Sequence, residues 1–358
     1  MPTVTVTMCV YNGERYVRAA IDSILAQTFR DFELVVVDDA STDGTTEILK
    51  QYDDPRIQLL HNTKNLGPTK SVNRAWRAGT ARYVAHQDAD DCSLPQRLEL
   101  QVKYLDSRPE VGLLGSNAEI IDEEGTVKFV DRFPCGHEEL RAGLVTDCIV
   151  HHSTMMYRRA LMERLNGYDE SFYFALDFDL QWRMTTFARF ECLPKTLIQY
   201  RVGHSSQISK RWAREQREYA RRIALRNLQE YMADEAFDER VGMRFYAVLH
   251  GQAQQWRIGD ALRLRRLWKK LLRDQASRTV WVPRLISVIH GVADRAPWNA
   301  HYLSLVIAVC LPLSHIRHLG PAFLRSSLTS RQLATVRGLV RWVRRPHRLR
   351  SKRRGHSE

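Results

Sequence analysis

Residues 4–45 read VTVTMCVYNGERYVRAAIDSILAQTFRDFELVVVDDASTDGT, and this stretch decides the expected fold. It opens with apolar side chains that alternate with threonine, which predicts a β-strand at Val4–Val10. Apolar residues at helical spacing follow in the range Glu14–Gln27, and Phe32–Val37 is a second β-rich run. The stretch therefore predicts a strand, a helix and another strand, the last of which ends at a pair of aspartates.

The alternation of strand and helix continues beyond residue 45. Strands are expected at Ile57–His61, Tyr83–His86 and Val111–Ile121. Helical patterns occupy Thr45–Tyr52, Thr69–Gly79, Arg97–Leu105, Met155–Leu165, Leu176–Ala188 and Arg211–Met232. Because strands that alternate with helices are typical of an α/β fold, we expect a mostly parallel central sheet with helices on both faces.

Positive charge is concentrated towards the end of the chain. The 358 residues carry a formal net charge of +13, and twelve of the 54 Lys and Arg residues fall between Arg317 and Arg354, where no Asp or Glu occurs. Such a segment suits an anionic partner, either membrane headgroups or nucleic acid. Its arginines are interleaved with apolar residues and Trp342, beside the apolar run Tyr302–Leu313, which favours peripheral membrane contact and makes nucleic acid the weaker alternative.

Three regions are expected along the chain. Residues 1–210 form the α/β domain, residues 211–298 an α-helical region, and residues 299–358 an apolar segment followed by the basic amphipathic tail. The longest apolar run is too short to cross a bilayer, because a spanning helix needs about 20 residues. The first residues show no secretory leader pattern and the six cysteines form no CxxC pair, so we expect a cytoplasmic protein.

The turn after the strand at Tyr83–His86 carries three aspartates within four residues. Asp88 and Asp90 point to the same side of an extended segment, and two carboxylates placed in this way can bind a hard divalent cation such as Mn²⁺ or Mg²⁺. The alternative is a solvated acidic turn before the next helix. We expect Asp91 to be structural, as a cap of that helix.

Two further features follow strand ends at the same expected edge of the sheet. Asp38 and Asp39 can accept hydrogen bonds from a nucleobase or a ribose, although the residues behind them, Ser41–Asp43, also suit the capping of a helix. Tyr11 follows the first strand, where its ring can either stack on a base or pack into a turn.

In this order, these features resemble the start of a family 2 glycosyltransferase with the GT-A fold. Beyond residues 4–45, the resemblance rests on motifs at the spacing usual in that family, namely Asn65-Leu66-Gly67, Asp88-Ala89-Asp90-Asp91, His151–Arg158, Asn166–Glu170, Ala175–Arg183 and Tyr200–His204. The resemblance extends from about Val4 to Lys210. One departure is Leu176, which stands where the family usually has an acidic residue.

The resemblance implies which residues bind a nucleotide-sugar donor. Tyr11 and Asp39 would hold the nucleobase, with Thr7 or Cys9 nearby. Asp88 would contact the ribose. The residues at these strand ends would therefore recognise the nucleoside of the donor.

The resemblance also implies a metal site and a catalytic base. Asp90 would bind a divalent metal, Mn²⁺ or Mg²⁺, that bridges the donor diphosphate, and His204 would complete the metal site. Such an ion offsets the charge that grows on the leaving diphosphate. Asp177 would take the proton of the acceptor hydroxyl as that hydroxyl attacks the anomeric carbon, with Asp179 as the fallback. A single direct displacement would invert the anomeric configuration.

Together with the basic tail, the resemblance implies an inverting enzyme of the hexosyltransferase type, peripheral on the cytoplasmic face of the membrane. A UDP-sugar is favoured as donor, a glycan or polyprenyl-linked hydroxyl as acceptor, and surface polysaccharide biosynthesis as the pathway. One alternative is a nucleotidyltransferase of GT-A-like fold, although residues 9–14 lack the glycine-rich basic loop usual there. The other is a non-catalytic protein that binds membrane or nucleic acid through its tail, against which Asp39, Asp90 and Asp177 argue.

Overall fold

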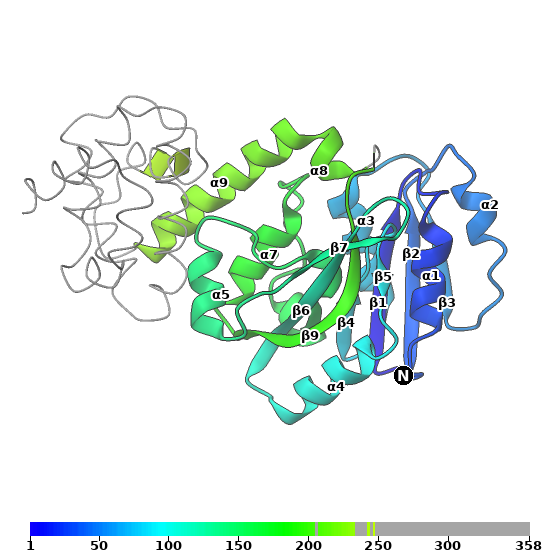
Figure 1. Ribbon diagram of the computed structural model, residues 1–358, viewed down its shortest axis with the longest axis horizontal. Helices are drawn as coiled ribbons and strands as arrows, with labels where there is room; N and C mark the ends of the chain where they lie inside the picture. Colours follow the sequence, from blue (N-terminus) through cyan, green and yellow to red (C-terminus); the bar gives the residue numbers. More distant parts are fainter. Residues whose placement is uncertain (205–206, 233–241, 244–245, 248–358) are drawn as a thin grey trace, which may run out of the picture. The chain divides into compact units, whose positions relative to one another are not determined.

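The computed structural model describes residues 1–204, 207–232, 242–243 and 246–247 (Figure 1). The chain separates into two compact units, Met1–Tyr231 and Met232–Glu358. The first unit contains the expected α/β domain and also the long helix α9 (Ala213–Tyr231). Most of the helical region expected at 211–298, and all of the apolar segment and basic tail at 299–358, lie outside the described residues.

A nine-stranded sheet forms the centre of the first unit. Its strands follow the order β3-β2-β1-β4-β8-β6-β9-β5, and β7 pairs with β6. The strands are β1 (Val4–Val10), β2 (Phe32–Asp38), β3 (Ile57–His61), β4 (Tyr83–His86), β5 (Cys92–Ser93), β6 (Val111–Ile121), β7 (Val127–Asp131), β8 (Met156–Arg158) and β9 (Arg189–Arg201). Strands β1 to β4 run parallel, as do β6 and β9, while β8 joins the two groups antiparallel to both. The α/β fold class is confirmed, and beyond β4 the sheet is mixed.

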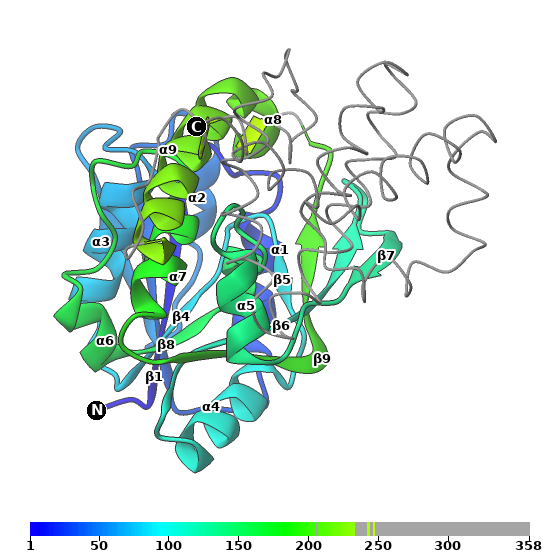
Figure 2. The same cartoon turned by 90° about the vertical axis from the view of Figure 1, so that its left-hand side faces the viewer.

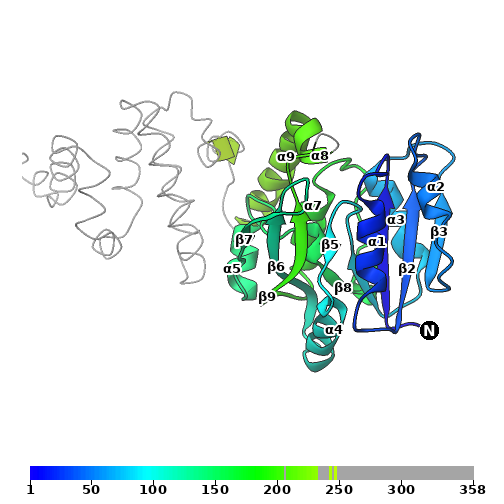
Figure 3. The same cartoon turned by 45° about the vertical axis from the view of Figure 1, so that its right-hand side comes forward.

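Helices cover both faces of the sheet because its inner strands are apolar on both sides. Helices α1 (Val17–Leu25) and α4 (Arg97–Ser107) share a buried core with one set of alternate strand residues, which includes Val36 of β2. Helix α3 (Pro68–Ala78) packs on the other set, which includes the adjacent Val37. Figures 2 and 3 show α1 and α3 on opposite sides of β1 and β2. Successive residues of β2 thus pack against helices on opposite faces of the sheet, as expected for a strand that is buried on both faces.

The helix expected at Met155–Leu165 is wrong in its first part. Residues Met156–Arg158 form β8, and the helix α6 begins only at Arg159. Met156 and Tyr157 are fully buried and pair with both β4 and β6, so the sheet decides their conformation. A strand of three residues is too short to show a period of two in the sequence.

The shorter helices connect the strands around the sheet. They are α2 (Thr45–Leu49), α5 (His137–Gly143), the 3₁₀ helix η1 (His152–Thr154), α6 (Arg159–Arg164), α7 (Leu176–Met184) and α8 (Ile208–Arg211). Within the part of the chain that the structure describes, no helix combines the length and the apolar character required to span a bilayer.

The long strand β9 has no counterpart among the expected elements. Pro194 lies inside it, and a proline cannot donate a backbone hydrogen bond to a neighbouring strand. The pairing with β6 shifts register at this point, since Leu193 faces Ser116 whereas Thr196 faces the next residue, Asn117. The irregularity hides the strand from pattern analysis.

Strands β1, β2 and β4 end at one edge of the sheet. Their register aligns Val10 with Asp38, and Thr7 with His86. The residues that follow the three strands therefore meet at this edge, as expected for the carboxyl ends of parallel strands. We refer to it below as the carboxyl edge.

Candidate active site

Asp39 lies directly after β2 and is held by the loop that leads into α3. Its carboxylate accepts hydrogen bonds from Asn62 Nδ2 at 2.6 Å and from the backbone N–H groups of Leu66 and Gly67 at 2.8 and 2.9 Å. The Asn-Leu-Gly motif therefore supplies backbone donors that fix this carboxylate. An ionised carboxylate has about four acceptor sites, so the protein occupies most of those of Asp39.

Two exposed tyrosines lie near Asp39. Tyr11 follows β1 and is 46% exposed, and Tyr173 is 41% exposed. Tyr173 packs over Gly67 so closely that a Cβ at that position would lie 2.3 Å from its ring. Gly67 also has a φ of 87°, so both the contact and the backbone conformation require glycine there. Burial, and then the charge of Asp39, raise the pKa of Tyr173.

Asp38, in contrast, is occupied inside the protein. Its carboxylate accepts hydrogen bonds from Ser41 N at 2.9 Å and Thr46 Oγ1 at 2.6 Å, and it lies 3.3 Å from His61 Nδ1. Burial alone would raise the pKa of Asp38, but these bonds lower it below its usual value. Asp38 therefore orders the turn after β2 rather than facing a ligand.

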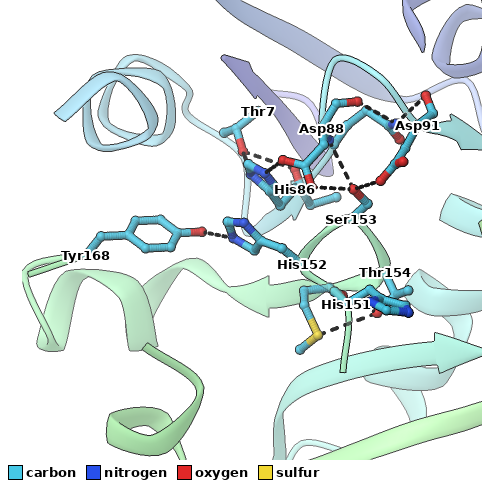
Figure 4. A network of polar contacts seen from close by, with 12 residues as sticks. Thr7, His86, Asp88, Asp91, His151, His152, Ser153, Thr154 and Tyr168 are labelled. Atoms are coloured by element: carbon cyan, nitrogen blue, oxygen red, sulfur yellow. Dashed lines mark hydrogen bonds and ion pairs between the residues drawn. The ribbon is translucent and has the colours of Figure 1, made fainter. Parts of the chain in front are cut away.

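Asp88 projects from the carboxyl edge with both carboxylate oxygens in contact with protein (Figure 4). Its Oδ1 lies 2.9 Å from His86 Nε2, and its Oδ2 accepts a hydrogen bond from the Ser153 hydroxyl at 2.7 Å. Desolvation would raise the pKa of Asp88, but the adjacent His86 and the Ser153 hydroxyl lower it well below its usual value. The carboxylate is thus ionised, and its side chain remains 37% exposed.

Asp91 is the buried member of the cluster. Its Oδ1 accepts a hydrogen bond from Arg201 N at 2.8 Å, and its Oδ2 lies 2.5 Å from the Ser153 hydroxyl. Burial, then the charges of Asp90 and Asp88, raise the pKa of Asp91 well above its usual value. The Ser153 hydroxyl has a single hydrogen. If it donates that hydrogen to Asp88, the hydrogen bond between Ser153 and Asp91 must be donated by a protonated Asp91.

The expected capping role of Asp91 is therefore wrong. Helix α4 begins after Gln96 without a side-chain cap, and Asp91 instead ties the turn after β4 to β9. The raised pKa of Asp91 favours its neutral form, which reduces the repulsion between three neighbouring aspartates. Sequence spacing could not reveal this role, because both partners of Asp91 come from distant segments.

A buried guanidinium supports the same turn. Arg97 is fully buried and donates to His86 O at 2.7 Å and to Gln87 Oε1 at 3.1 Å. Burial lowers the pKa of Arg97 to about 9, while neighbouring acidic groups, the ionised Asp88 among them, act in the opposite direction. At neutral pH this residue therefore places a positive charge close to the aspartates.

Asp90 and His204 meet at the carboxyl edge. Nε2 of His204 lies 2.8 Å from Oδ2 of Asp90, and Arg201 Nε donates to the backbone carbonyl of Asp90 at 2.9 Å. The Asp90 side chain is 31% exposed, whereas His204 is buried. A carboxylate oxygen beside an imidazole nitrogen is a donor set that suits Mn²⁺ or another divalent ion, so the residues present fit the expected metal site.

A second group of potential ligand atoms consists of His86, Asp88 and His152, which lie within 4.8 Å of one another. The two imidazole rings stack face to face, with centroids 3.5 Å apart and planes inclined by 13°. A ligated metal lies in the plane of each imidazole, and one ion cannot lie in two parallel planes. In this arrangement the two histidines do not share a metal.

Asp177 lies in the first turn of α7, beneath the sharp turn at Ala175, whose φ is 56°. Its Oδ2 accepts a hydrogen bond from Cys148 Sγ at 3.2 Å. Burial raises the pKa of Asp177, the thiol lowers it, and the charge of Asp88 raises it further. The charge of Asp88 therefore acts on the carboxyl group of Asp177.

Asp179, two residues further along, is fully buried. Its two oxygens accept charged hydrogen bonds from Arg183 Nε at 2.7 Å and Arg226 Nη1 at 2.5 Å. The Arg183 contact lies within α7, and the Arg226 contact joins α7 to α9. Asp179 is thus occupied as a structural ion pair, whereas Asp177 is the partly exposed carboxylate of this helix.

The residues at the carboxyl edge include several that the sequence did not single out. Thr7 is buried, with its hydroxyl 3.3 Å from Ala85 O and 3.4 Å from His86 Nδ1, so its assignment to the donor stays a prediction. Sequence reasoning missed His86, Ser153 and Cys148. The one available signal was position, because His86 ends the strand that leads into the aspartates.

Comparison with known proteins gives the family of the chain and the class of its fold. Residues 5–165 match the model of glycosyl transferase family 2. An uncharacterised glycosyltransferase of Haemophilus influenzae is 30% identical over 254 residues, which cover 67% of this chain and 77% of that protein. An Escherichia coli enzyme named UDP-Glc:α-D-GlcNAc-diphosphoundecaprenol β-1,3-glucosyltransferase is 34% identical over 128 residues, 36% of this chain and 50% of the other.

Solved structures share the fold at low sequence identity. Staphylococcus aureus TarS 1–349 in complex with UDP-GlcNAc aligns with a TM-score of 0.54 and 18% identity, over 96% of this chain and 91% of the other. The Pyrobaculum calidifontis mannosyltransferase PcManGT, in complex with GDP-Man and Mn²⁺, aligns with a TM-score of 0.51 and 19% identity, over 96% and 88%. The fold is that of GT-A glycosyltransferases. The chain belongs to glycosyl transferase family 2.

Proposed function

We propose that this glycosyltransferase transfers a hexosyl group from a nucleotide-diphosphate sugar to a hydroxyl of a glycan or a polyprenyl-linked lipid, with inversion, in surface polysaccharide biosynthesis. A UDP-sugar is the favoured donor. The name of the E. coli relative, which pairs UDP-Glc with a diphosphoundecaprenol acceptor, supports this choice. The UDP-GlcNAc bound to TarS supports a UDP-sugar as well, whereas the GDP-Man bound to PcManGT keeps GDP-sugars in the test.

In this proposal the carboxyl edge binds the donor. Tyr11 stacks on the nucleobase, Asp39 accepts a hydrogen bond from it, and the ionised Asp88 accepts one from the ribose. Asp90 and His204 would hold Mn²⁺ or Mg²⁺, which when bound offsets the negative charge of the leaving diphosphate. The Mn²⁺ in the PcManGT complex supports a divalent ion for this fold.

Asp177 is the proposed base. Its raised pKa suits proton transfer better than that of an ordinary aspartate, since a base is most effective when its pKa approaches the working pH. The carboxylate removes the proton from the acceptor hydroxyl as the oxygen attacks the anomeric carbon and the diphosphate departs. The observation that carries the proposal is the contact between Asp90 Oδ2 and His204 Nε2 at 2.8 Å on the carboxyl edge, where Asp39 and Asp88 also lie.

The basic tail is the proposed membrane contact. Its alternation of arginine with apolar residues and Trp342 suits an interfacial amphipathic segment on the cytoplasmic face, close to a lipid-linked acceptor. Flotation with anionic liposomes, with and without residues 299–358, measures this contact. We expect the full chain to float and the truncated chain to remain at the bottom, and equal flotation of the two would remove the membrane role.

The catalytic proposal is tested by a donor screen. The full-length protein is incubated with UDP-, GDP- and dTDP-hexoses and Mn²⁺ or Mg²⁺, and release of the nucleoside diphosphate is measured with and without acceptor glycans. We expect metal-dependent release from at least one UDP-hexose. If no donor is bound or cleaved under any of these conditions, the proposed function is wrong.

A further inference from the structure

His86 is a buried histidine that contacts the donor side of the carboxyl edge. It is the last residue of β4, is 3% exposed, and directs Nε2 to Asp88 at 2.9 Å. On the other side of the ring, Nδ1 lies 3.4 Å from the hydroxyl of Thr7 on β1. Figure 4 shows the ring between these two partners. Both contacts are compatible with an Nε2–H group that donates to Asp88.

A second histidine fixes the rotation of this ring. His152 of η1 stacks on His86 with the centroids 3.5 Å apart, and its Nε2 lies 2.8 Å from the Tyr168 hydroxyl. Burial, and then repulsion from His86, lower the pKa of His152 well below its usual value. His152 is therefore neutral, so the stacked rings carry at most one positive charge. The stack prevents His86 from turning away from Asp88.

The opposite oxygen of Asp88 is fixed as well. The Ser153 hydroxyl donates to Oδ2 at 2.7 Å and itself lies 3.2 Å from the backbone nitrogen of Asp88. One protein partner on each oxygen sets the plane of the carboxylate while leaving a lone pair free on each. The side chain is 37% exposed, so the carboxylate is partly open to solvent. A ligand that binds a carboxylate ordered in advance loses less entropy than one that must order it.

We propose that His86 is a positioning residue, which together with Ser153 holds the Asp88 carboxylate in the orientation that accepts hydrogen bonds from the ribose hydroxyls of the donor. The contact thereby sets a preference for ribonucleotides over deoxyribonucleotides. The inference rests on the proposed donor site and adds the group that determines its sugar selectivity. His86 itself does not touch the ligand.

The experiment compares nucleotide binding to the full-length protein in the presence of Mn²⁺. Dissociation constants of UDP and GDP are measured by calorimetry beside those of their 2′-deoxy and 3′-deoxy forms. The variants are His86→Leu, which removes the donor, and His86→Gln, whose amide nitrogen can replace Nε2–H. The matched control is His61→Ala, which removes a histidine contact with a different aspartate, Asp38.

We expect the wild type to prefer the ribonucleotide over at least one deoxy form by about tenfold, as expected for one hydroxyl-to-carboxylate hydrogen bond. In His86→Leu the ribonucleotide should bind as weakly as the deoxy form, whose own affinity stays unchanged. His86→Gln should restore most of the preference, and His61→Ala should retain all of it. The unchanged deoxy affinity distinguishes lost positioning from misfolding.

Three results would overturn the proposal. The preference is unchanged in His86→Leu, all nucleotides weaken equally in both His86 variants, or the wild type binds ribo and deoxy forms equally. In each of these cases nucleotide binding by the wild type is intact, so the proposed glycosyl transfer survives, although equal binding of ribo and deoxy forms would remove the Asp88–ribose contact from it. If the wild type binds no nucleotide at all, the proposed function fails and this inference fails with it.

Discussion

Nε2 of His204 lies 2.8 Å from Oδ2 of Asp90, although 114 positions separate the two residues in the chain. Asp90 follows β4, and His204 follows β9, which runs in the same direction as β4 and therefore ends at the same edge. A buried imidazole beside a partly exposed carboxylate places one nitrogen and one oxygen ligand within reach of a single ion. This relationship supports a divalent metal at the donor diphosphate.

We expect Asp90→Asn to lose the metal dependence of nucleotide binding. An amide keeps the shape of the carboxylate but removes its charge, and a bound divalent ion contributes several kcal/mol to such a site. The Mn²⁺-dependent gain in affinity for UDP or GDP should fall on the order of 100-fold, while the affinity measured in EDTA stays unchanged. Calorimetric titration with and without Mn²⁺ measures both. A variant with wild-type Mn²⁺ dependence would remove Asp90 from the metal site.

The proton on Asp91 leads to a prediction about stability. Because the folded-state pKa of Asp91 is raised, its stabilising contribution is complete below the unfolded pKa of about 4 and is lost as pH rises through the folded pKa. In Asp91→Asn, the neutral amide can donate to Ser153 and accept from Arg201 N at every pH. We therefore expect unfolding free energies within about 1 kcal/mol of wild type at low pH, and a relative gain as pH rises.

Urea denaturation between pH 4 and 9 measures this difference. Asp88→Asn is the matched control, because it faces the same Ser153 hydroxyl but replaces a carboxylate that is ionised. A loss of several kcal/mol in Asp91→Asn that grows with pH would mean that Asp91 is ionised in the folded protein.

Much of the fold and the position of part of the candidate site could be predicted from the sequence, because the patterns that determine them are local in the chain. Strands β1, β2 and β4 show strong patterns, and Tyr11, Asp39 and Asp88 each follow one of these strands, so their shared edge is a consequence of parallel pairing. The likeness to solved GT-A structures confirms the fold class expected from these patterns.

What the sequence could not supply depends on distant partners. Asp91 meets Ser153 across 62 positions and Arg201 across 110, so its role as a neutral link appears only in the fold. The choice between Asp177 and Asp179 depends on Arg226 of α9, which occupies Asp179 from 47 positions away. Spacing along α7 contains no information about that contact.

The Cys148 thiol contributes a testable shift in pH dependence. Its hydrogen bond lowers the pKa of Asp177 against the effect of burial, so its removal should raise that pKa further. A base must be ionised to act, and activity therefore falls as pH decreases through its pKa. We expect Cys148→Ala to move the acid limb of the kcat profile to higher pH, by up to about one unit for a weak sulfur donor, and Cys148→Ser to move it less. An acid limb that shifts to lower pH would contradict the contact.

The central claim, that Asp177 is the base of a nucleotide-sugar transferase, is tested most directly by separating binding from transfer in Asp177→Asn. The amide keeps the size of the side chain but cannot take a proton, so transfer to acceptor should fall by about 10²- to 10⁴-fold.

The control is Asp179→Asn. It leaves Arg183 and Arg226 without their buried partner and should lower the unfolding free energy by about 3 kcal/mol, the low end of the range for a broken buried pair because both guanidinium groups are partly exposed. The decisive measurement is kcat for transfer beside the dissociation constant of the nucleotide in Asp177→Asn. We predict the loss of kcat with nucleotide affinity and stability unchanged, and wild-type kcat in this variant would show that Asp177 is not the base.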